Sequence, residues 1–178
     1  HDHALIELPQ FISHTFTEDQ KIILVGHSDG GTIAMLYAHK YPDRIIGIVS
    51  MAAHVINEPE TIKGVHETVI AYEQGKLEGL KKYHGENTPA LFFAWADIWR
   101  SPLFKDWNIS KEVGGSIPTL LLQGADDQYG TLRQLELIEE VNSNVISHLI
   151  PECNHHPHLE QGEIVLEKIQ SWVQSTIT

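Results

Sequence analysis

The segment that most constrains this chain is residues 21–31, KIILVGHSDGG. An apolar run ends at Gly26, the pentapeptide GHSDG follows, and a helical pattern begins at once. This is the G-x-S-x-G context of a nucleophile elbow, a strand–turn–helix that exposes the hydroxyl of Ser28. The turn crowds the backbone on both sides of the serine, so Gly26 and Gly30 fit there. A chance match in a glycine-containing turn is the alternative, and the flanking strand and helix patterns favour the elbow.

Alternating strand and helix patterns surround this segment. Continuous apolar runs, without polar alternation, are typical of parallel strands buried on both faces. Strands separated by helices predict an α/β fold with a doubly wound, mostly parallel sheet. The expected strands are residues 21–26, 44–50, 117–124 and 144–150, and the expected helices are residues 4–16, 32–41, 132–141 and a last one that includes 165–173.

The pattern changes between residues 54 and 116, where strand signals stop. Helical segments at 58–74, 76–83 and 89–99 are separated by glycines, and most of the aromatic residues gather here. The sequence therefore predicts a core formed by residues 1–53 and 117–178, interrupted by a helical insertion at 54–116.

Composition excludes several functional classes. The chain has 178 residues, of which 42% are hydrophobic and 20% charged, as expected for a globular domain. The formal net charge of −12 disfavours a nucleic-acid or anionic-membrane partner. One cysteine permits no internal disulfide. Because no apolar run reaches the ~20 residues of a membrane helix and no signal peptide is visible, we expect a cytoplasmic protein.

Three chemically reactive residue types follow three of the expected strands. Ser28 follows the first strand, Ala125-Asp126-Asp127 follows the third, and the histidine-rich loop 151–158 follows the fourth. The carboxyl ends of parallel strands meet at one edge of a sheet, so these side chains should converge there. A serine needs an adjacent base to act as a nucleophile, and the base needs an orienting acid.

These motifs, GHSDGG, LLLQGADD and CNHHPHLEQ, together resemble the C-terminal part of an α/β-hydrolase-fold enzyme. The order Ser, Asp, His is the chain order of that family. The sequence most resembles the small esterases, lactonases and carbon–carbon bond hydrolases that carry a helical cap, which is the role implied for residues 54–116. The opening His1-Asp2-His3 and the helix after it resemble the run before the elbow in that group.

The resemblance implies a role for each residue. Ser28 is the nucleophile, and the backbone N–H of Asp29 binds the oxyanion. The acid is the fourth residue of a G-x-x-D turn, which points to Asp127, with Asp126 as the alternative. Asn154 stands where the family usually has glycine. Asn tolerates positive φ, so the base is expected to be His155.

Two other interpretations of the histidine loop were weighed. His155, His156 and His158 could bind a metal, but no acidic or cysteine ligand stands at zincin-like spacing, so we expect no metal and no cofactor. Cys153 could be a nucleophile, but the elbow already presents a serine, and we expect a small buried residue. His158 is expected to begin the last helix.

The implied function is a serine hydrolase that cleaves an ester, thioester or other activated acyl bond of a small apolar substrate through an acyl-enzyme. One alternative is a carbon–carbon bond hydrolase acting on a vinylogous diketone. An alternative of another class is a non-catalytic ligand-binding protein of the same fold. Trp95 and Trp99, four residues apart on one helix face, are candidates to line the substrate pocket or to pack the insertion.

The resembled fold has several strands before its elbow, and this chain contains none of them. We therefore expect the missing N-terminal segment of the same protein as a partner, which would also supply the second oxyanion donor. The strand at 21–26 is too apolar for an exposed edge, so we expect it to be paired on both sides or covered. Residues 1–178 alone should be poorly soluble or inactive.

Overall fold

The computed structural model describes residues 1–176, which form two compact units. The first contains His1–Val55 and the chain from Ile109 onward, and the second is Ile56–Asn108. Residues 109–116, which the sequence analysis assigned to the insertion, therefore lie in the first unit. The reason is local: the Ile109 N–H donates to the Val55 carbonyl at 2.8 Å, and the side chains of Ile109 and Val113 are buried.

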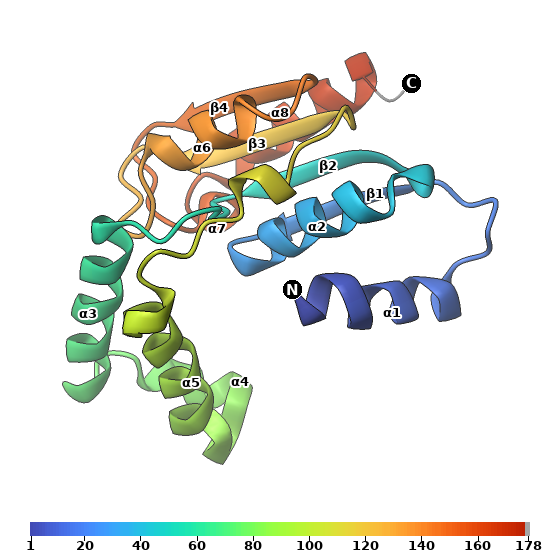
Figure 1. Cartoon of the computed structure of the whole chain (residues 1–178). Helices are drawn as coiled ribbons and strands as arrows, with labels where there is room; N and C mark the ends of the chain where they lie inside the picture. The colour runs from blue at the N-terminus through green and yellow to red at the C-terminus, as the bar shows by residue number, and fades with distance from the viewer. Residues whose placement is uncertain (177–178) are drawn as a thin grey trace. The chain divides into compact units, whose positions relative to one another are not determined.

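The first unit is built on a sheet of four parallel strands in the order β1-β2-β3-β4 (Figure 1). The doubly wound parallel sheet expected from the sequence is confirmed. Parallel neighbours place all four carboxyl ends at one edge, which is where polar side chains can converge. The strands are β1 (Ile22–His27), β2 (Ile45–Met51), β3 (Thr119–Gly124) and β4 (Val145–Ile150).

Helices cover both faces of this sheet. Figure 1 shows α2 and α6 on one side and α8 on the other. Alternate residues of β2 separate accordingly: Val49 packs in a buried cluster with Trp172 of α8, whereas Ser50 faces Gly31 of α2. The helices of this unit are η1 (His3–Glu7), α1 (Leu8–Thr15), α2 (Asp29–Lys40), η2 (Pro42–Arg44), η6 (Ser110–Glu112), α6 (Leu132–Glu139), α7 (Pro157–Glu160) and α8 (Gly162–Thr176).

The last helix begins later than expected. His158 lies in the one-turn helix α7, and the backbone leaves the helical conformation at Gln161 (φ −133°, ψ 47°) before α8 starts at Gly162. The expectation that His158 begins the last helix is therefore wrong. The break leaves α7 as part of the loop that carries the histidines.

The second unit is helical and has an aromatic core. Tyr72 stacks on Phe92 with ring centroids 3.9 Å apart, and Trp99 packs edge-on against Phe104 and Trp107. In place of one helix at 76–83, the structure has a short 3-10 helix, η3, followed by the one-turn helix α4. The elements are α3 (Pro59–Glu73), η3 (Glu78–Leu80), α4 (Lys81–His84), η4 (Gly85–Asn87), α5 (Thr88–Arg100) and η5 (Pro102–Phe104).

One expectation about β1 is wrong. Within the described chain β1 pairs with β2 alone, so its other edge is open, and the Val25 side chain is 60% exposed. The faces of the strand are only partly covered: α2 packs on one side and Ile23 contacts the α8 cluster on the other, but Val25, on the same face as Ile23, stays exposed. Covering the faces of a strand does not satisfy the free hydrogen-bonding groups along its edge.

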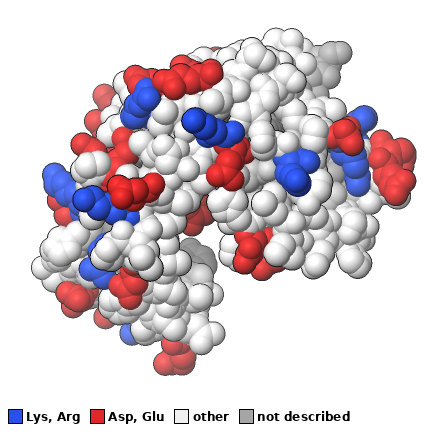
Figure 2. All heavy atoms as spheres, viewed as in Figure 1, with Lys and Arg blue, Asp and Glu red and all other residues white. Residues whose placement is uncertain are grey.

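The surface carries mixed charge. On the face shown in Figure 2, Lys and Arg side chains are interspersed with Asp and Glu and with wide uncharged areas. That face therefore offers no concentrated cationic surface to an anionic macromolecule. Among residues 1–176, no helix is both long enough and apolar enough to cross a membrane.

Candidate active site

Ser28 occupies the turn between β1 and α2 in a strained conformation. Its φ of 54° and ψ of −123° lie where non-glycine residues are rare. The turn is held by backbone hydrogen bonds: Ser28 N–H donates to the Met51 carbonyl at 2.8 Å, and Gly31 N–H donates to the Ser28 carbonyl at 2.9 Å. A Cβ at Gly26 would overlap the backbone of Gly30, so the turn closes only with glycine there.

The sheet brings Ser28, His155 and Asp127 into one hydrogen-bonded line. The Ser28 Oγ lies 3.0 Å from His155 Nε2, and His155 Nδ1 lies 2.9 and 3.0 Å from the two carboxylate oxygens of Asp127. The serine hydroxyl can donate to Nε2 while Nδ1–H donates to the acid, which is the relation of nucleophile, base and orienting group. Asp126 is exposed and is not part of this line.

Two further donors hold the Asp127 carboxylate, whose side chain is fully buried. The Tyr129 backbone N–H donates to Oδ1 at 2.8 Å, and the Gln123 side-chain amide donates to Oδ2 at 2.6 Å. A buried carboxylate is tolerated only where donors replace its lost water. The sequence analysis did not identify Gln123, which lies on β3 four residues before the acid.

The backbone around His155 is held by side chains from both sides. His27 Nε2–H donates to the His155 carbonyl at 2.7 Å, and burial lowers the pKa of His27 to about 4. The Glu160 carboxylate accepts from the N–H groups of Asn154 at 2.8 Å and His156 at 2.9 Å. Hydrogen bonds from Asn154 lower the pKa of Glu160, so this carboxylate is ionised at neutral pH.

A buried histidine that the sequence analysis missed also lies beside this line. His54 follows β2; its Nε2 lies 3.0 Å from the Tyr129 carbonyl, and its ring centroid is 5.7 Å from that of His155. Burial lowers the pKa of His54, which favours the uncharged imidazole. Its position directly after the carboxyl end of a buried strand was the available signal.

The start of α2 provides a candidate oxyanion donor. Asp29 is the first residue of the helix, so its N–H has no acceptor within the helix and lies at the positive end of the helix dipole. The Ser28 carbonyl meanwhile accepts from Gly31 and Thr32. The Asp29 N–H, which the sequence analysis expects to bind the oxyanion, therefore belongs to the peptide bond that directly follows Ser28.

Neither alternative for the histidine loop gains support. Among residues 1–176, no group of three or more His, Cys, Asp or Glu side chains is arranged to hold a metal ion. Cys153 is fully buried, and burial raises the pKa of its thiol to about 11, so the reactive thiolate is disfavoured at neutral pH. The expectation of a small buried residue at Cys153 is confirmed.

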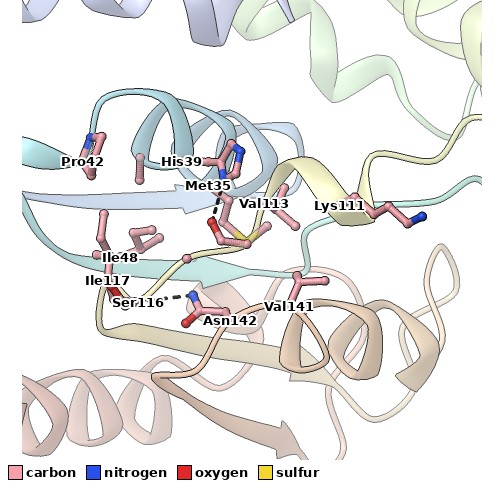
Figure 3. Close-up of a pocket in the computed structure, with 13 residues that line it drawn as sticks. Met35, His39, Pro42, Ile48, Lys111, Val113, Ser116, Ile117, Val141 and Asn142 are labelled. Carbon is pink, nitrogen blue, oxygen red and sulfur yellow. Dashed lines mark hydrogen bonds between the residues drawn. The ribbon is translucent and has the colours of Figure 1, made fainter.

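A cavity of about 520 Å³ lies near the amino ends of the central strands (Figure 3). Its lining includes Met35 and His39 of α2 and residues 114–117, which precede β3. Ser28, Asp127 and His155 follow the carboxyl ends of β1, β3 and β4, whereas this cavity lies before the amino ends of β2 and β3. The cavity is therefore separate from the Ser28 site.

Comparison with known proteins agrees with this fold. The sequence model of the family described as alpha/beta hydrolase fold matches residues 16–88. The chain is 26% identical to the 2-hydroxy-6-oxo-6-phenylhexa-2,4-dienoate hydrolase of Burkholderia cepacia, over 80% of this chain and 59% of that protein. The structure of a thermophilic esterase from Thermogutta terrifontis is 25% identical, with a TM-score of 0.60, over 96% of this chain and 70% of that one. This chain has the α/β-hydrolase fold, and the comparisons support its place in that superfamily.

A third relative shows the same pattern of coverage. The cis-3-alkyl-4-alkyloxetan-2-one decarboxylase of Shewanella oneidensis is 23% identical, over 89% of this chain and 62% of that protein. The chain thus spans about three fifths of the length of these two relatives, which it matches over most of its own length.

The first prediction concerns Glu160. Glu160→Gln replaces the carboxylate that accepts hydrogen bonds from the N–H groups of Asn154 and His156 with an uncharged amide. We therefore expect kcat to fall severalfold and the unfolding midpoint at pH 7 to drop. Because the pKa of Glu160 is lowered in the folded state, its contribution is present above the ordinary glutamate pKa of about 4.3 and is lost as the pH falls further.

Denaturant unfolding at pH 7 and pH 3.5 measures this, with Glu167→Gln on the exposed side of α8 as the matched control. The difference between wild type and Glu160→Gln should shrink at pH 3.5. An equal difference at both pH values would contradict the assigned role of the charge.

Proposed function

We propose that this chain carries the reaction centre of a serine hydrolase that cleaves an ester, thioester or other activated acyl bond of a small apolar substrate. The observation that carries the proposal is the line from Ser28 through His155 to Asp127, with distances of 3.0 and 2.9 Å, built on a strained turn. The chain is also similar to a protein named as a thermophilic esterase, and this similarity supports an acyl substrate.

In the proposed mechanism, His155 Nε2 takes the proton of the Ser28 hydroxyl as Oγ attacks the carbonyl carbon. The oxyanion of the tetrahedral intermediate accepts a hydrogen bond from the Asp29 N–H. When the intermediate collapses, the leaving alcohol or thiol takes the proton from His155, and an acyl group remains on Ser28. Water then attacks the acyl-enzyme with His155 as base, and the carboxylic acid is released. Asp127 keeps Nδ1 protonated and stabilises the imidazolium.

A second candidate is carbon–carbon bond hydrolysis of a vinylogous diketone, which uses the same three residues. The similarity to the Burkholderia hydrolase over 80% of this chain favours keeping it. A non-catalytic binding protein of this fold is the alternative of another class. Turnover of p-nitrophenyl esters against turnover of a vinylogous diketone separates the two reactions, and absence of both would favour the binding protein.

The second unit is the proposed source of the acyl pocket. We propose that Trp95 or Trp99 contacts the acyl group. Trp99 is only 7% exposed and packs against Phe104 and Trp107, so core packing is enough to explain it. Trp95 is therefore the stronger candidate. Trp95→Ala should change the ratio of kcat/KM for aromatic and short acyl esters. An unchanged ratio would leave Trp95 with packing alone.

The open edge of β1 is the proposed docking place of an upstream segment of the same protein, which would also bring the second oxyanion donor. The exposed Val25 and the unpaired edge support this partner. Residues 1–178 alone should then be poorly soluble or inactive, because one oxyanion donor lowers the barrier by ~3 kcal/mol. A soluble monomer of this chain with the full-length protein's esterase turnover would contradict the proposal.

The triad assignment is tested by substitution in the full-length protein. Ser28→Ala and His155→Ala should each lower kcat by about 10⁴-fold or more while the circular dichroism spectrum is unchanged. Asp127→Asn should lower kcat far more than the matched control Asp126→Asn, because only Asp127 contacts His155. Folded Ser28→Ala protein with wild-type turnover would contradict the proposed function.

A further inference from the structure

The inference concerns Gln123, and it rests on the proposed function. Gln123 is the second-last residue of β3, near the carboxyl end of the strand, and it is 1% exposed. Its Nε2 donates to Asp127 Oδ2 at 2.6 Å and to the Gly130 carbonyl at 3.3 Å. Both of its amide protons are therefore used at the turn that carries the acid.

Chemistry fixes the orientation of this amide. The reversed orientation would place Oε1 against the Asp127 carboxylate and the Gly130 carbonyl, which are both acceptors. In the orientation observed, Oε1 is buried and has no hydrogen-bond partner among the described residues. A buried acceptor without a partner costs stability. The amide keeps this orientation because the Asp127 carboxylate and the Gly130 carbonyl both accept hydrogen bonds from its nitrogen.

The two donors divide the carboxylate between them. Tyr129 N–H binds Oδ1 and Gln123 Nε2 binds Oδ2, so each oxygen has one donor besides His155. His155 Nδ1 lies almost equally far from both oxygens, at 3.0 and 2.9 Å. Rotation of the carboxylate would change this relation, and the pair of donors opposes such rotation.

We propose that Gln123 is a positioning residue that holds the Asp127 carboxylate toward His155. The donor from Tyr129 is a backbone N–H, whereas the donor from Gln123 is a side-chain amide that substitution can remove. Since Gln123 is buried behind the acid, it acts on the reaction through Asp127 and makes no contact with substrate. Its loss should therefore change kcat and leave KM unchanged.

The test is a double-mutant cycle in the full-length protein. Gln123→Met removes the donors while keeping an unbranched chain, and should lower kcat about tenfold, the size expected for one hydrogen bond to a charged group. In an Asp127→Ala background the same substitution should change kcat by less than about twofold, because its target is gone. A purely structural role would give the same loss in both backgrounds.

Two further variants control for folding. Asn142→Leu removes a buried amide at the opposite end of β3, where Asn142 Nδ2 donates to Thr119 Oγ1 at 3.1 Å, and should leave kcat within about twofold once unfolded protein is excluded. Gln123→Glu keeps shape and length but replaces the donor with an oxygen, and should lower kcat at least as much as Gln123→Met.

The outcomes separate this inference from the proposed function. If Ser28→Ala keeps wild-type turnover, the proposed function is wrong. If Ser28→Ala is inactive but Gln123→Glu turns over like wild type, or Gln123→Met costs the same with and without Asp127, the positioning role alone is wrong. A raised KM with unchanged kcat would also overturn it.

Discussion

The conformation of Ser28 is the constraint on which the rest of the site depends. Its positive φ costs on the order of 1–3 kcal/mol, and the turn persists because its surroundings hold it. The Met51 carbonyl of the next strand binds its N–H, and Gly26 lets the backbone of Gly30 approach closely. Since α2 starts at Asp29, directly after Ser28, the proposed nucleophile and the proposed oxyanion donor come from one turn.

Equally close backbone contacts position Asp127 and His155, the proposed acid and base. A Cβ at Gly124 would overlap the Asn154 carbonyl, so the end of β3 and the histidine loop meet directly. His27, at the end of β1, donates a hydrogen bond to the His155 carbonyl. The Glu160 carboxylate accepts from the N–H groups of Asn154 and His156, the residues on either side of His155. The hydrogen bonds that set Ser28, His155 and Asp127 thus connect three strand ends, and each supports the geometry of the others.

Sequence reasoning reached the fold because apolar runs located the strands, and polar residues just past parallel strands had to share one end of the sheet. The choice of Asp127 and His155 within their loops came instead from the resemblance to a known family. Sequence reasoning missed Gln123 and Glu160 because their roles depend on side chains that reach neighbouring segments, which no periodicity encodes. It ended the insertion at residue 116, whereas the compact helical unit ends at Asn108, because the contacts of Ile109 with Val55 depend on the folded chain and leave no mark on composition. It misjudged β1 because an apolar strand sequence does not by itself supply a second hydrogen-bonded neighbour, and among the described residues β1 pairs with β2 alone.

The central claim is that the fold activates Ser28 as a nucleophile. The most direct measurement is labelling of the full-length protein with a fluorophosphonate, followed by peptide mass spectrometry. We expect a single adduct on the peptide that contains Ser28, and a much slower reaction in folded His155→Ala protein, because the hydroxyl is a weak nucleophile without its base. No adduct on folded wild-type protein, or labelling that is indifferent to His155, would contradict the account.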